Sequence, residues 1–462
     1  MEDFVILGAG IAGLTAAREL LRLGQRVTVL EKAAEVGGLA RTLQHDGFRF
    51  DLGGHRFHSN NPSVVQWLRD LLGANLLSVP RVSHIKLNGR FVTYPLSFPN
   101  AFTAFHPLKA TQLATSYILA HFTERGRPDN SFEDWIVKRF GHMMYQHFFQ
   151  PYTEKVWGVS GQQLSAEWAA ARIGLPNMWQ AIRHTLRPPA EPPPTTIEQF
   201  YYPRYGFGMI PQALAHEIRG LGGRIVTQAT PVCVQANKAG FTVTGESPSG
   251  AFHEHTRELI STIPLNHLLG LLPDNGRLPH LHQYQLHYRG LICLFLAIRR
   301  HQISRDSWTY FPEPSLLFGR THEPKNWSPD MVPDDSVTSL CVEIFASPHE
   351  PVWSWSDEHL ARQVIQQLAQ IGWLTAQEVQ TYWLARIPHA YPRYDLEYRD
   401  HLRQVHQFLQ QWPNLHLVGR TGSFRYLNSD GVIEDVFRFL GQRFPQTAVS
   451  IQPIPQQNGR WA

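Results

Sequence analysis

The chain has 462 residues, 43% of them hydrophobic, and a formal net charge of +4. Its basic charge is mostly arginine and is dispersed, so the clustered basic face that nucleic-acid binding needs is not predicted. The three cysteines are odd in number and widely spaced, which argues against a disulfide framework and a cysteine metal site. No apolar run approaches the roughly 20 residues of a membrane span, and the first apolar run belongs to a predicted strand rather than a signal peptide, so a cytoplasmic location is expected.

The first predicted elements form a βαβ unit. Residues 4–7 predict a buried strand, a glycine-rich turn and a helix follow, and residues 27–30 predict a second strand that ends at Glu31. The turn has the spacing Gly-x-Gly-x-x-Gly, whose glycines allow a tight turn, the approach of a pyrophosphate and close packing of the helix. Glu31 stands where a carboxylate accepts hydrogen bonds from an adenosine ribose. The residues expected to bind a dinucleotide here are Gly8, Gly10, Ile11, Ala12, Gly13, Glu31 and Lys32.

Two further glycine-rich segments follow this unit. With them the chain resembles the flavoprotein superfamily of amine oxidases, protoporphyrinogen oxidases, phytoene desaturases and UDP-galactopyranose mutases, in which a glycine doublet and a basic residue lie against the FAD phosphates. The resemblance implies FAD as the cofactor. It also implies a non-covalent link, because covalent attachment in some relatives needs a cysteine that is absent between Arg420 and Asp430. The cofactor residues implied in the two segments are Gly37, Gly38, Leu39, Arg41, Gly53, Gly54, His55, Arg56 and Phe57.

The next part of the chain changes pattern twice. Residues from about 100 to 200 are mostly helical in pattern, with a capping box from Ser131 to Asp134 and a stiff proline-rich loop at residues 187–194. Strands are then expected between residues 223 and 234. In the superfamily this region brings a backbone amide and carbonyl to the adenine, and Val232 matches that position.

The C-terminal half is predicted to contain further strands and then a segment that returns to the FAD-binding domain. Residues 256–263 predict a further strand of the FAD-binding domain, and residues from about 275 to 390 favour strands of a substrate-side wall. Residues 415–419 return to the FAD-binding domain, and a helix is expected after Asp430. The glutamine- and proline-rich tail after Pro445 is expected to be mobile.

Together these elements predict a mixed α/β fold. A Rossmann-like FAD-binding domain of the glutathione-reductase type is expected to be intertwined with a helical plus antiparallel-sheet substrate domain. The FAD-binding domain is predicted to comprise residues 1–95, 206–270 and 391–445. The substrate domain is predicted to comprise residues 96–205 and 271–390, and residues 446–462 are the tail.

Within the superfamily the chain is most similar to the UDP-galactopyranose mutases, whose motifs recur here in the same order along almost the whole chain. The matching segments are His55-Arg56-Phe57-His58-Ser59-Asn60-Asn61, Tyr94-Pro95-Leu96 with Asn100, Tyr152-Thr153-Glu154-Lys155-Val156-Trp157-Gly158, Gly319-Arg320-Thr321-His322-Glu323, and Gly419 to Asp430. The resemblance adds cofactor residues near the C-terminus, namely Gly419, Arg420, Asn428, Asp430, Gly431 and Val432.

This resemblance implies an isomerase that interconverts the pyranose and furanose forms of a nucleotide sugar, with N5 of reduced flavin as the nucleophile and no net redox change. Such a site must stabilise a diphosphate leaving group, for which fixed arginines and a tyrosine hydroxyl are suited. Arg320, Arg420 and Tyr426 fall on matching positions, and His55 and His58 are expected near the flavin. These five are the candidate catalytic residues, although the two histidines can equally be structural.

The chain departs from the mutase pattern at four places, one of which is a longer insert that contains the proline-rich loop. The arginine of a mobile loop is missing after Arg172, so Arg183 or Arg187 would have to serve instead. A tyrosine pair is replaced by Pro351-Val352-Trp353, and a terminal Asp-Met becomes Asn428-Ser429.

These departures leave two alternatives open. One is an FAD-dependent oxidoreductase of the amine oxidase or protoporphyrinogen oxidase type, which takes hydride from an apolar or amine substrate. The other is a flavoprotein with a binding or accessory role. An apolar substrate is compatible with the aromatic side chains of the predicted sheet, which are equally typical of a core: Trp308, Tyr310, Phe311, Phe318 and Trp327.

Overall fold

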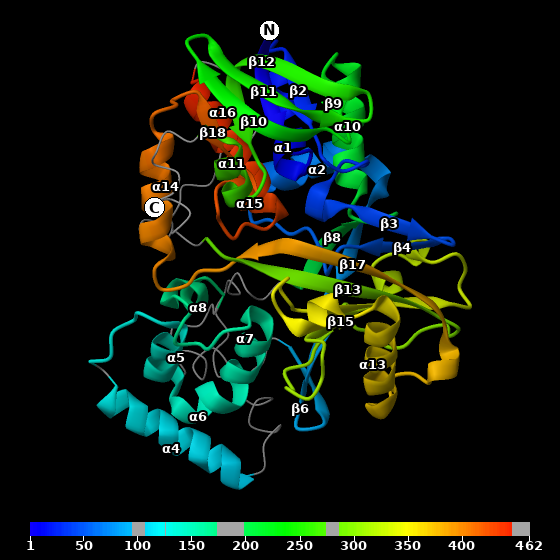
Figure 1. Cartoon of the computed structure of the whole chain (residues 1–462). Helices are drawn as coiled ribbons and strands as arrows, with labels where there is room; N and C mark the ends of the chain where they lie inside the picture. Colours follow the sequence, from blue (N-terminus) through cyan, green and yellow to red (C-terminus); the bar gives the residue numbers. More distant parts are fainter. Residues whose placement is uncertain (95–106, 125, 173–197, 274–285, 446–462) are drawn as a thin grey trace.

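The computed structural model describes residues 1–94, 107–124, 126–172, 198–273 and 286–445, which form two large sheets and a group of helices (Figure 1). Some predictions concern residues outside this description. They are those for Pro95, Leu96 and Asn100, for Arg183, Arg187 and the proline-rich loop, and for the tail 446–462. Among the residues described, no helix is both long and apolar enough to cross a membrane.

The first sheet contains the predicted βαβ unit. Its strands are β1 (Glu2–Leu7), β2 (Val27–Leu30), β9 (Arg224–Val226), β10 (Thr230–Asn237), β11 (Gly240–Ser247), β12 (Gly250–Ser261) and β18 (Leu415–Leu417). They lie in the order β10-β11-β12-β1-β2-β9, and β18 pairs with β12. β1 runs parallel to both β2 and β12, which is the arrangement of a dinucleotide-binding sheet.

Helices cover both faces of this sheet. Phe4 and Ile6 of β1 point into one core cluster, whereas Val5 and Leu7 point into another, because side chains alternate along a strand. The first cluster also contains residues of α1 (Ile11–Arg22), α2 (Pro62–Leu72), α10 (Met209–Gly220) and α16 (Ser429–Arg443). The second contains residues of α11 (Leu265–Leu271) and α14 (Tyr398–Leu409).

The second sheet lies below the first in Figure 1. Its strands are β6 (Ser83–Leu87), β7 (Arg90–Thr93), β13 (Tyr288–Ile298), β14 (Trp308–Tyr310), β15 (Arg320–His322), β16 (Thr338–Ile344) and β17 (Val379–Pro392). They lie in the order β17-β13-β16-β15-β14-β6-β7. Two small sheets are added by β3 (Thr42–His45) with β4 (Phe48–Asp51), and by β5 (Leu76–Pro80) with β8 (Gln199–Pro203).

One longer helix lies among the described residues of the region from about 275 to 390 that favours strands. It is α13 (Asp357–Gln370), and it packs its buried face against the second sheet. The side chain of Ser356 accepts a hydrogen bond from the backbone N–H of His359 at 3.2 Å and so caps its first turn. A serine followed by two acidic residues is the signal in the sequence that predicts this helix start.

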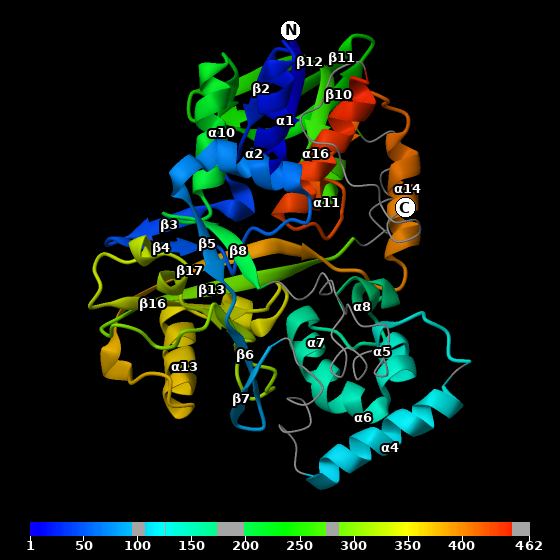
Figure 2. The ribbon, with the colours of Figure 1, turned by 180° about the vertical axis from the view of Figure 1, so that it is seen from behind.

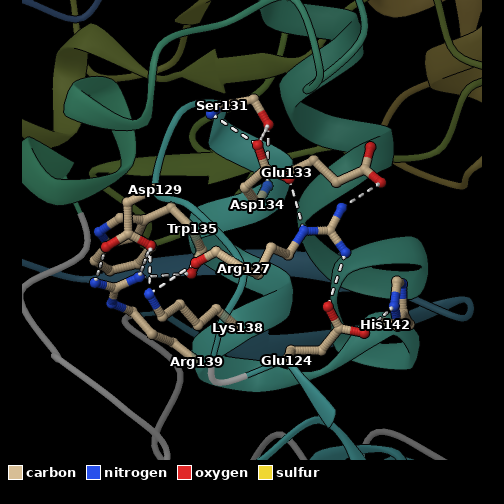
Figure 3. A network of polar contacts seen from close by, with 10 residues as sticks. All are labelled: Glu124, Arg127, Asp129, Ser131, Glu133, Asp134, Trp135, Lys138, Arg139 and His142. Atoms are coloured by element: carbon tan, nitrogen blue, oxygen red, sulfur yellow. Dashed lines mark hydrogen bonds and ion pairs between the residues drawn. The ribbon is translucent and has the colours of Figure 1, made fainter.

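The predicted helical region is confirmed where it is described. It consists of α4 (Pro107–Thr123), α5 (Phe132–Phe140), α6 (His142–Met144), a π-helix η3 (Tyr145–Phe149), α7 (Gln150–Trp157) and α8 (Ala166–Arg172). The capping box is also confirmed, since Ser131 and Asp134 each accept a hydrogen bond from the other's backbone N–H at 3.1 Å (Figure 3). The remaining short helices are η1 (Gly38–Ala40), η2 (Gly73–Asn75), η4 (Pro324–Asn326), η5 (Pro329–Met331), η6 (Pro351–Ser354), η7 (Ala376–Glu378) and α15 (Gly419–Gly422).

The fold class is therefore confirmed: a Rossmann-like unit is intertwined with helices and a second sheet in which neighbouring strands from β17 through β13, β16 and β15 to β14 are antiparallel. The division into domains remains a prediction. Strands β6 and β7 belong to the second sheet although they lie within the first predicted FAD-binding segment, 1–95. If sheets define the domains, that segment ends near residue 80.

Candidate functional site

The glycine-rich turn after β1 is closed on one side and open on the other. A side-chain carbon at Gly8, whose φ is +99°, would lie 2.6 Å from the Thr262 hydroxyl, and one at Gly13 would collide with the Gly8 carbonyl oxygen. A carbon at Gly10 would meet no atom within 4 Å. The turn is therefore packed tightly from behind and leaves space at Gly10, where a phosphate can approach the backbone and the start of α1.

Glu31 is held beside this turn. Its carboxylate accepts hydrogen bonds from the backbone N–H groups of Ala9, at 2.7 Å, and Ala33, at 2.8 Å. Lys32 follows it and is exposed. Val232 lies on β10 at a break in register, where Pro231 and Cys233 have partners on β11 and Val232 has none. Such a break in the register can turn backbone groups away from β11, as a contact to an adenine would require.

The glycine doublet packs onto the turn. Gly37 donates its N–H to the Ala9 carbonyl at 2.7 Å, and its φ of +119° is a conformation that favours glycine. The Nε of Arg41 donates to the Gly38 carbonyl at 3.2 Å. The Arg41 side chain also lines a polar cavity of about 310 Å³, together with residues such as Gln212 and Arg219.

The predicted cofactor residues in and after the glycine doublet do not share one environment: some are packed in the core and others lie near the candidate site. Gly53 has a φ of +102°, and Leu39 packs against a core cluster. Phe57 is buried and pairs through its backbone with Tyr201. The Arg56 guanidinium lies 4.7 Å from the Trp308 ring centre, and its charge reaches Asp430 at the start of α16.

The start of α16 carries the last cofactor residues. Asn428 is the N-cap, Gly431 lies in the first turn, and Val432 is buried in the core. Burial raises the pKa of Asp430 to about 6. The N-terminus of this helix has the positive end of its dipole, which can bind the partly negative edge of a ring system.

A buried ion pair joins the second sheet to this region. Arg320 on β15 lies opposite Glu343 on β16, and two of its nitrogens donate to the two carboxylate oxygens at 2.9 and 2.5 Å. The backbone N–H of Gly54 donates to the same carboxylate at 2.9 Å. Burial would raise the pKa of Glu343, but the charge and the hydrogen bonds of Arg320 hold it at about 2. Glu343 therefore remains ionised and fixes Arg320 beside Gly54.

Arg420 is held between two tyrosine rings. Its guanidinium carbon lies 4.2 Å from the ring centre of Tyr426 and 4.9 Å from that of Tyr391, and the two rings are stacked at 5.8 Å. Two of its nitrogens donate to the carbonyls of Leu427, at 2.9 Å, and Ala390, at 3.0 Å. Its Nε is buried and has no protein partner, so the Nε–H remains available for a bound group.

His55 lies between these two charged groups. Burial and, next, the positive charge of Arg420 lower the pKa of His55 to about 4, and the charges of Glu343 and Arg320 also reach it. Its ring stacks on Phe207 at 5.3 Å, and its Nδ1 is buried without a hydrogen-bond partner in the protein. His55 is thus neutral at pH 7 and has a ring nitrogen available for a cofactor or substrate.

This low pKa leads to a prediction for the apoprotein. The unfolded chain takes up a proton at His55 near pH 6.5, whereas the folded protein resists it until about pH 4, so stability falls as the pH is lowered through that window. When the pH is lowered from 6.5 to about 4, the free energy of unfolding of His55→Gln should fall by about 1–3 kcal/mol less than that of the parent. Urea unfolding between these pH values measures this. Equal losses of stability in His55→Gln and in the parent would contradict the prediction. The control is His253→Gln, which replaces an exposed histidine and should lose as much stability as the parent.

The structure thus brings four of the five candidate catalytic residues to one place. The charges of Arg320 and Arg420 both act on His55 and on Tyr391, and Tyr426 stacks on Tyr391. His58 is not among them; its ring nitrogen lies 3.2 Å from the Asn60 side chain.

Two residues of this place do not stand out in the sequence motifs, Glu343 and Tyr391. A lone carboxylate in the otherwise uncharged run Thr-Ser-Leu-Cys-Val-Glu-Ile is a signal that points to Glu343, because an unpaired charge is rarely buried. Pro351, Val352 and Trp353, which stand in place of the tyrosine pair of the mutases, lie in the short helix η6. The tyrosine that stacks on Tyr426 is supplied by β17.

The aromatic side chains of the second sheet are mostly core. Trp308, Phe311, Phe318 and Trp327 are at most 5% exposed and belong to core clusters. Tyr310 is the exception, since its ring packs against Tyr94 at 4.8 Å and Tyr152 at 5.5 Å. Among the residues described, no group of three histidine, cysteine or acidic side chains is placed to hold a metal ion.

Comparisons with known proteins agree with this arrangement. A family model described as flavin containing amine oxidoreductase matches residues 11–434. A probable UDP-galactopyranose mutase from Klebsiella pneumoniae is 26% identical over 170 residues, which are 36% of this chain and 43% of the relative. A chloroplastic protoporphyrinogen oxidase from Nicotiana tabacum is 23% identical over 290 residues, which are 57% of this chain and 50% of the relative. The matches thus cover about half of these relatives or less.

Solved structures are similar over nearly the full length. A reduced UDP-galactopyranose mutase superposes with a TM-score of 0.83 at 24% identity and covers 97% of both chains. A putative protoporphyrinogen oxidase from Exiguobacterium sp. superposes with a TM-score of 0.75 at 17% identity and covers 96% of this chain and 99% of its own. At these identities the likeness establishes the fold.

Proposed function

Because the chain belongs to the flavin containing amine oxidoreductase family, we propose that it binds FAD without a covalent link and isomerises a nucleotide sugar in the manner of a UDP-galactopyranose mutase. A flavin cofactor follows from the family itself. The identity of the cofactor as FAD, the substrate class and the reaction are the proposal.

The residues of the first sheet fit FAD. The open space at Gly10, the starts of α1 and α16, and the carboxylate of Glu31 suit a dinucleotide with two phosphates and a ribose. The buried, unpartnered Nδ1 of His55 and Nε of Arg420 suit polar atoms of a ring system at the other end. When bound and reduced, FAD would supply a nucleophilic nitrogen at this place.

The dinucleotide contact leads to a second prediction. Replacing Glu31 with alanine removes the carboxylate expected to accept from the ribose, so FAD should bind more weakly by about 1–3 kcal/mol. Titration of the apoprotein with FAD, followed by flavin fluorescence, measures the dissociation constant. Glu358→Ala, at an exposed glutamate of α13, is the control and should leave affinity unchanged. A Glu31→Ala protein with parental affinity would rule out this contact.

The observation that carries the proposed reaction is the convergence of Arg320, Arg420 and Tyr426. Arg320 lies about 100 residues before the other two along the chain, and their matching positions in the mutase motifs predict a shared anionic site. Here Arg420 offers its Nε–H and its charge to a developing negative charge, Tyr426 packs against it, and Glu343 keeps Arg320 oriented. Neutral His55 can accept or donate a hydrogen bond without adding charge.

Binding of a nucleotide tests this proposal. UDP and UDP-galactose are titrated separately into oxidised and dithionite-reduced holoenzyme, and the flavin absorbance is followed. We expect a spectral shift with weak affinity, because the mobile-loop arginine of the mutases is missing, and we expect the shift to be lost in Arg420→Ala. If neither compound perturbs the flavin at millimolar concentration, the nucleotide-sugar proposal fails.

One observation favours a second candidate. Arg320 is engaged through two of its nitrogens by Glu343, and Arg420 already donates to two carbonyls, so both would have to share or exchange partners to hold a diphosphate. An FAD-dependent oxidoreductase that takes hydride from an apolar or amine substrate does not need two free arginines. Tyr391 and Tyr426 would then supply an apolar wall. If neither nucleotide perturbs the flavin, the oxidoreductase becomes the function that the site supports best.

A further inference from the structure

An apolar stripe on the outward side of α4 has no role in the proposed function. Leu108, Ile118, Leu119 and Phe122 are 70%, 55%, 63% and 69% exposed, and they are four of the eleven large hydrophobic side chains that are exposed among the residues described. With the exposed Thr111, Gln112 and Thr115 they recur every three or four residues. That spacing puts them on one side of the helix, which we call the outward face of α4.

The helix that carries this face is held firmly. Leu113 and Ala120, on the opposite side, are almost wholly buried. Ser116 accepts a hydrogen bond from the Met143 N–H at 3.1 Å, and a side-chain carbon at Gly141 would lie 2.9 Å from the Ser116 carbonyl, so α4 packs closely on the start of α6. The outward face is therefore presented by a helix docked on its other side.

Paired charges anchor the end of the same helix. Arg127 donates to Glu124 at 3.2 Å and to Asp134 at 2.6 Å, and Glu124 also lies 3.4 Å from a ring nitrogen of His142 (Figure 3). Arg139 forms a second pair with Asp129 at 2.7 Å. These contacts fix the turn between α4 and α5.

The chemistry of the stripe points to a lipid surface. The outward face has no charged side chain, and from 107 to 123 the chain has a lysine, Lys109, and a histidine, His121, but no carboxylate. An uncharged apolar stripe, with a lysine beside it and no carboxylate from 107 to 123, suits the interface of a membrane with anionic lipids. Figures 1 and 2 show α4 at the end of the molecule opposite the first sheet.

A second copy of the chain fits the stripe less well. Four side chains of this size, between 55% and 70% exposed, would bury at most roughly 500 Å², whereas a stable interface needs roughly 800 Å² on each partner. A lipid surface requires no matching area and accepts an uncharged stripe of any length. We propose that the outward face of α4 binds this protein peripherally to membranes that contain anionic lipid.

Vesicle flotation of the full-length holoprotein tests the proposal. We expect the parent to float with vesicles of phosphatidylcholine and phosphatidylglycerol, and a variant with both Ile118→Gln and Leu119→Gln to bind about tenfold more weakly, because two apolar side chains no longer enter the lipid. The matched control carries Leu221→Gln and Leu396→Gln, two exposed leucines on other elements, and should float like the parent. Unchanged flavin content and melting temperature show that the variants are folded.

Two results would overturn the proposal. One is a parent protein that stays with the unbound fraction, or a parent and an α4 variant that float equally. The other is a parent that is dimeric by sedimentation velocity and becomes monomeric in the α4 variant without binding vesicles, which would assign the outward face to a second copy of the chain.

Discussion

Replacing Glu343 with alanine should lower the free energy of unfolding by about 3–5 kcal/mol, because it leaves the Arg320 guanidinium without its carboxylate in a largely dry site. The Gly54 N–H would lose its acceptor at the same time. Urea unfolding of the apoprotein, followed by tryptophan fluorescence, measures the loss. The effect should be among the largest of any single substitution in the second sheet.

The matched control for this prediction removes both partners. A protein with Glu343→Leu and Arg320→Met has no buried charge at this position, so it should be more stable than Glu343→Ala and close to the parent. If Glu343→Ala loses less than about 1 kcal/mol, the pair is too well solvated to fix Arg320, and its role as a positioning contact would be wrong.

Replacing Arg420 with alanine should lower kcat by about 10²–10³ when a nucleotide sugar is turned over, since that is the usual loss when one donor to a developing negative charge is removed. The KM should change less, because the donor acts mainly on charge that develops during the reaction. Turnover of dithionite-reduced holoenzyme, measured by separating the two sugar nucleotides, provides both constants.

The control for Arg420 is Arg438→Ala, which removes an arginine of α16 that bonds to Asp435 at 3.1 Å. Its turnover should stay within about threefold of the parent, as expected for a partly exposed ion pair. Flavin content is measured for each variant, so that loss of cofactor is not mistaken for loss of catalysis. An Arg420→Ala enzyme that holds FAD and keeps parental kcat would show that Arg420 does not act on the reaction.

The parts of the fold that sequence patterns predicted are those with local signals. The strand, glycine turn, helix and acid of the first unit lie within about 30 residues, and each step constrains the next. The capping box at Ser131 is likewise local. The helix α13 has a comparable start signal in Ser356, but the β-branched and aromatic residues around it favour strands and obscure it.

Contacts across the second sheet could not be predicted in the same way. Glu343 meets Arg320 because β15 and β16 pair in one register, and a shift of one residue would point their side chains to opposite faces. Tyr391 reaches Tyr426 because β17 is 14 residues long and ends beside α15. Strand register and strand length depend on the whole sheet, so the resemblance to the mutase motifs identified Arg320 and Tyr426 but not the residues that hold them.

The most direct test of the central claim compares two redox states of one enzyme. Holoenzyme reduced with dithionite and holoenzyme left oxidised are each incubated with UDP-galactopyranose, and the products are separated by chromatography. The proposed function predicts that the reduced enzyme forms the furanose isomer with no change in its flavin spectrum after turnover, and that the oxidised enzyme forms none. No isomer from the reduced enzyme, together with bleaching of oxidised flavin by an amine or apolar substrate, would contradict the claim and assign the site to hydride transfer.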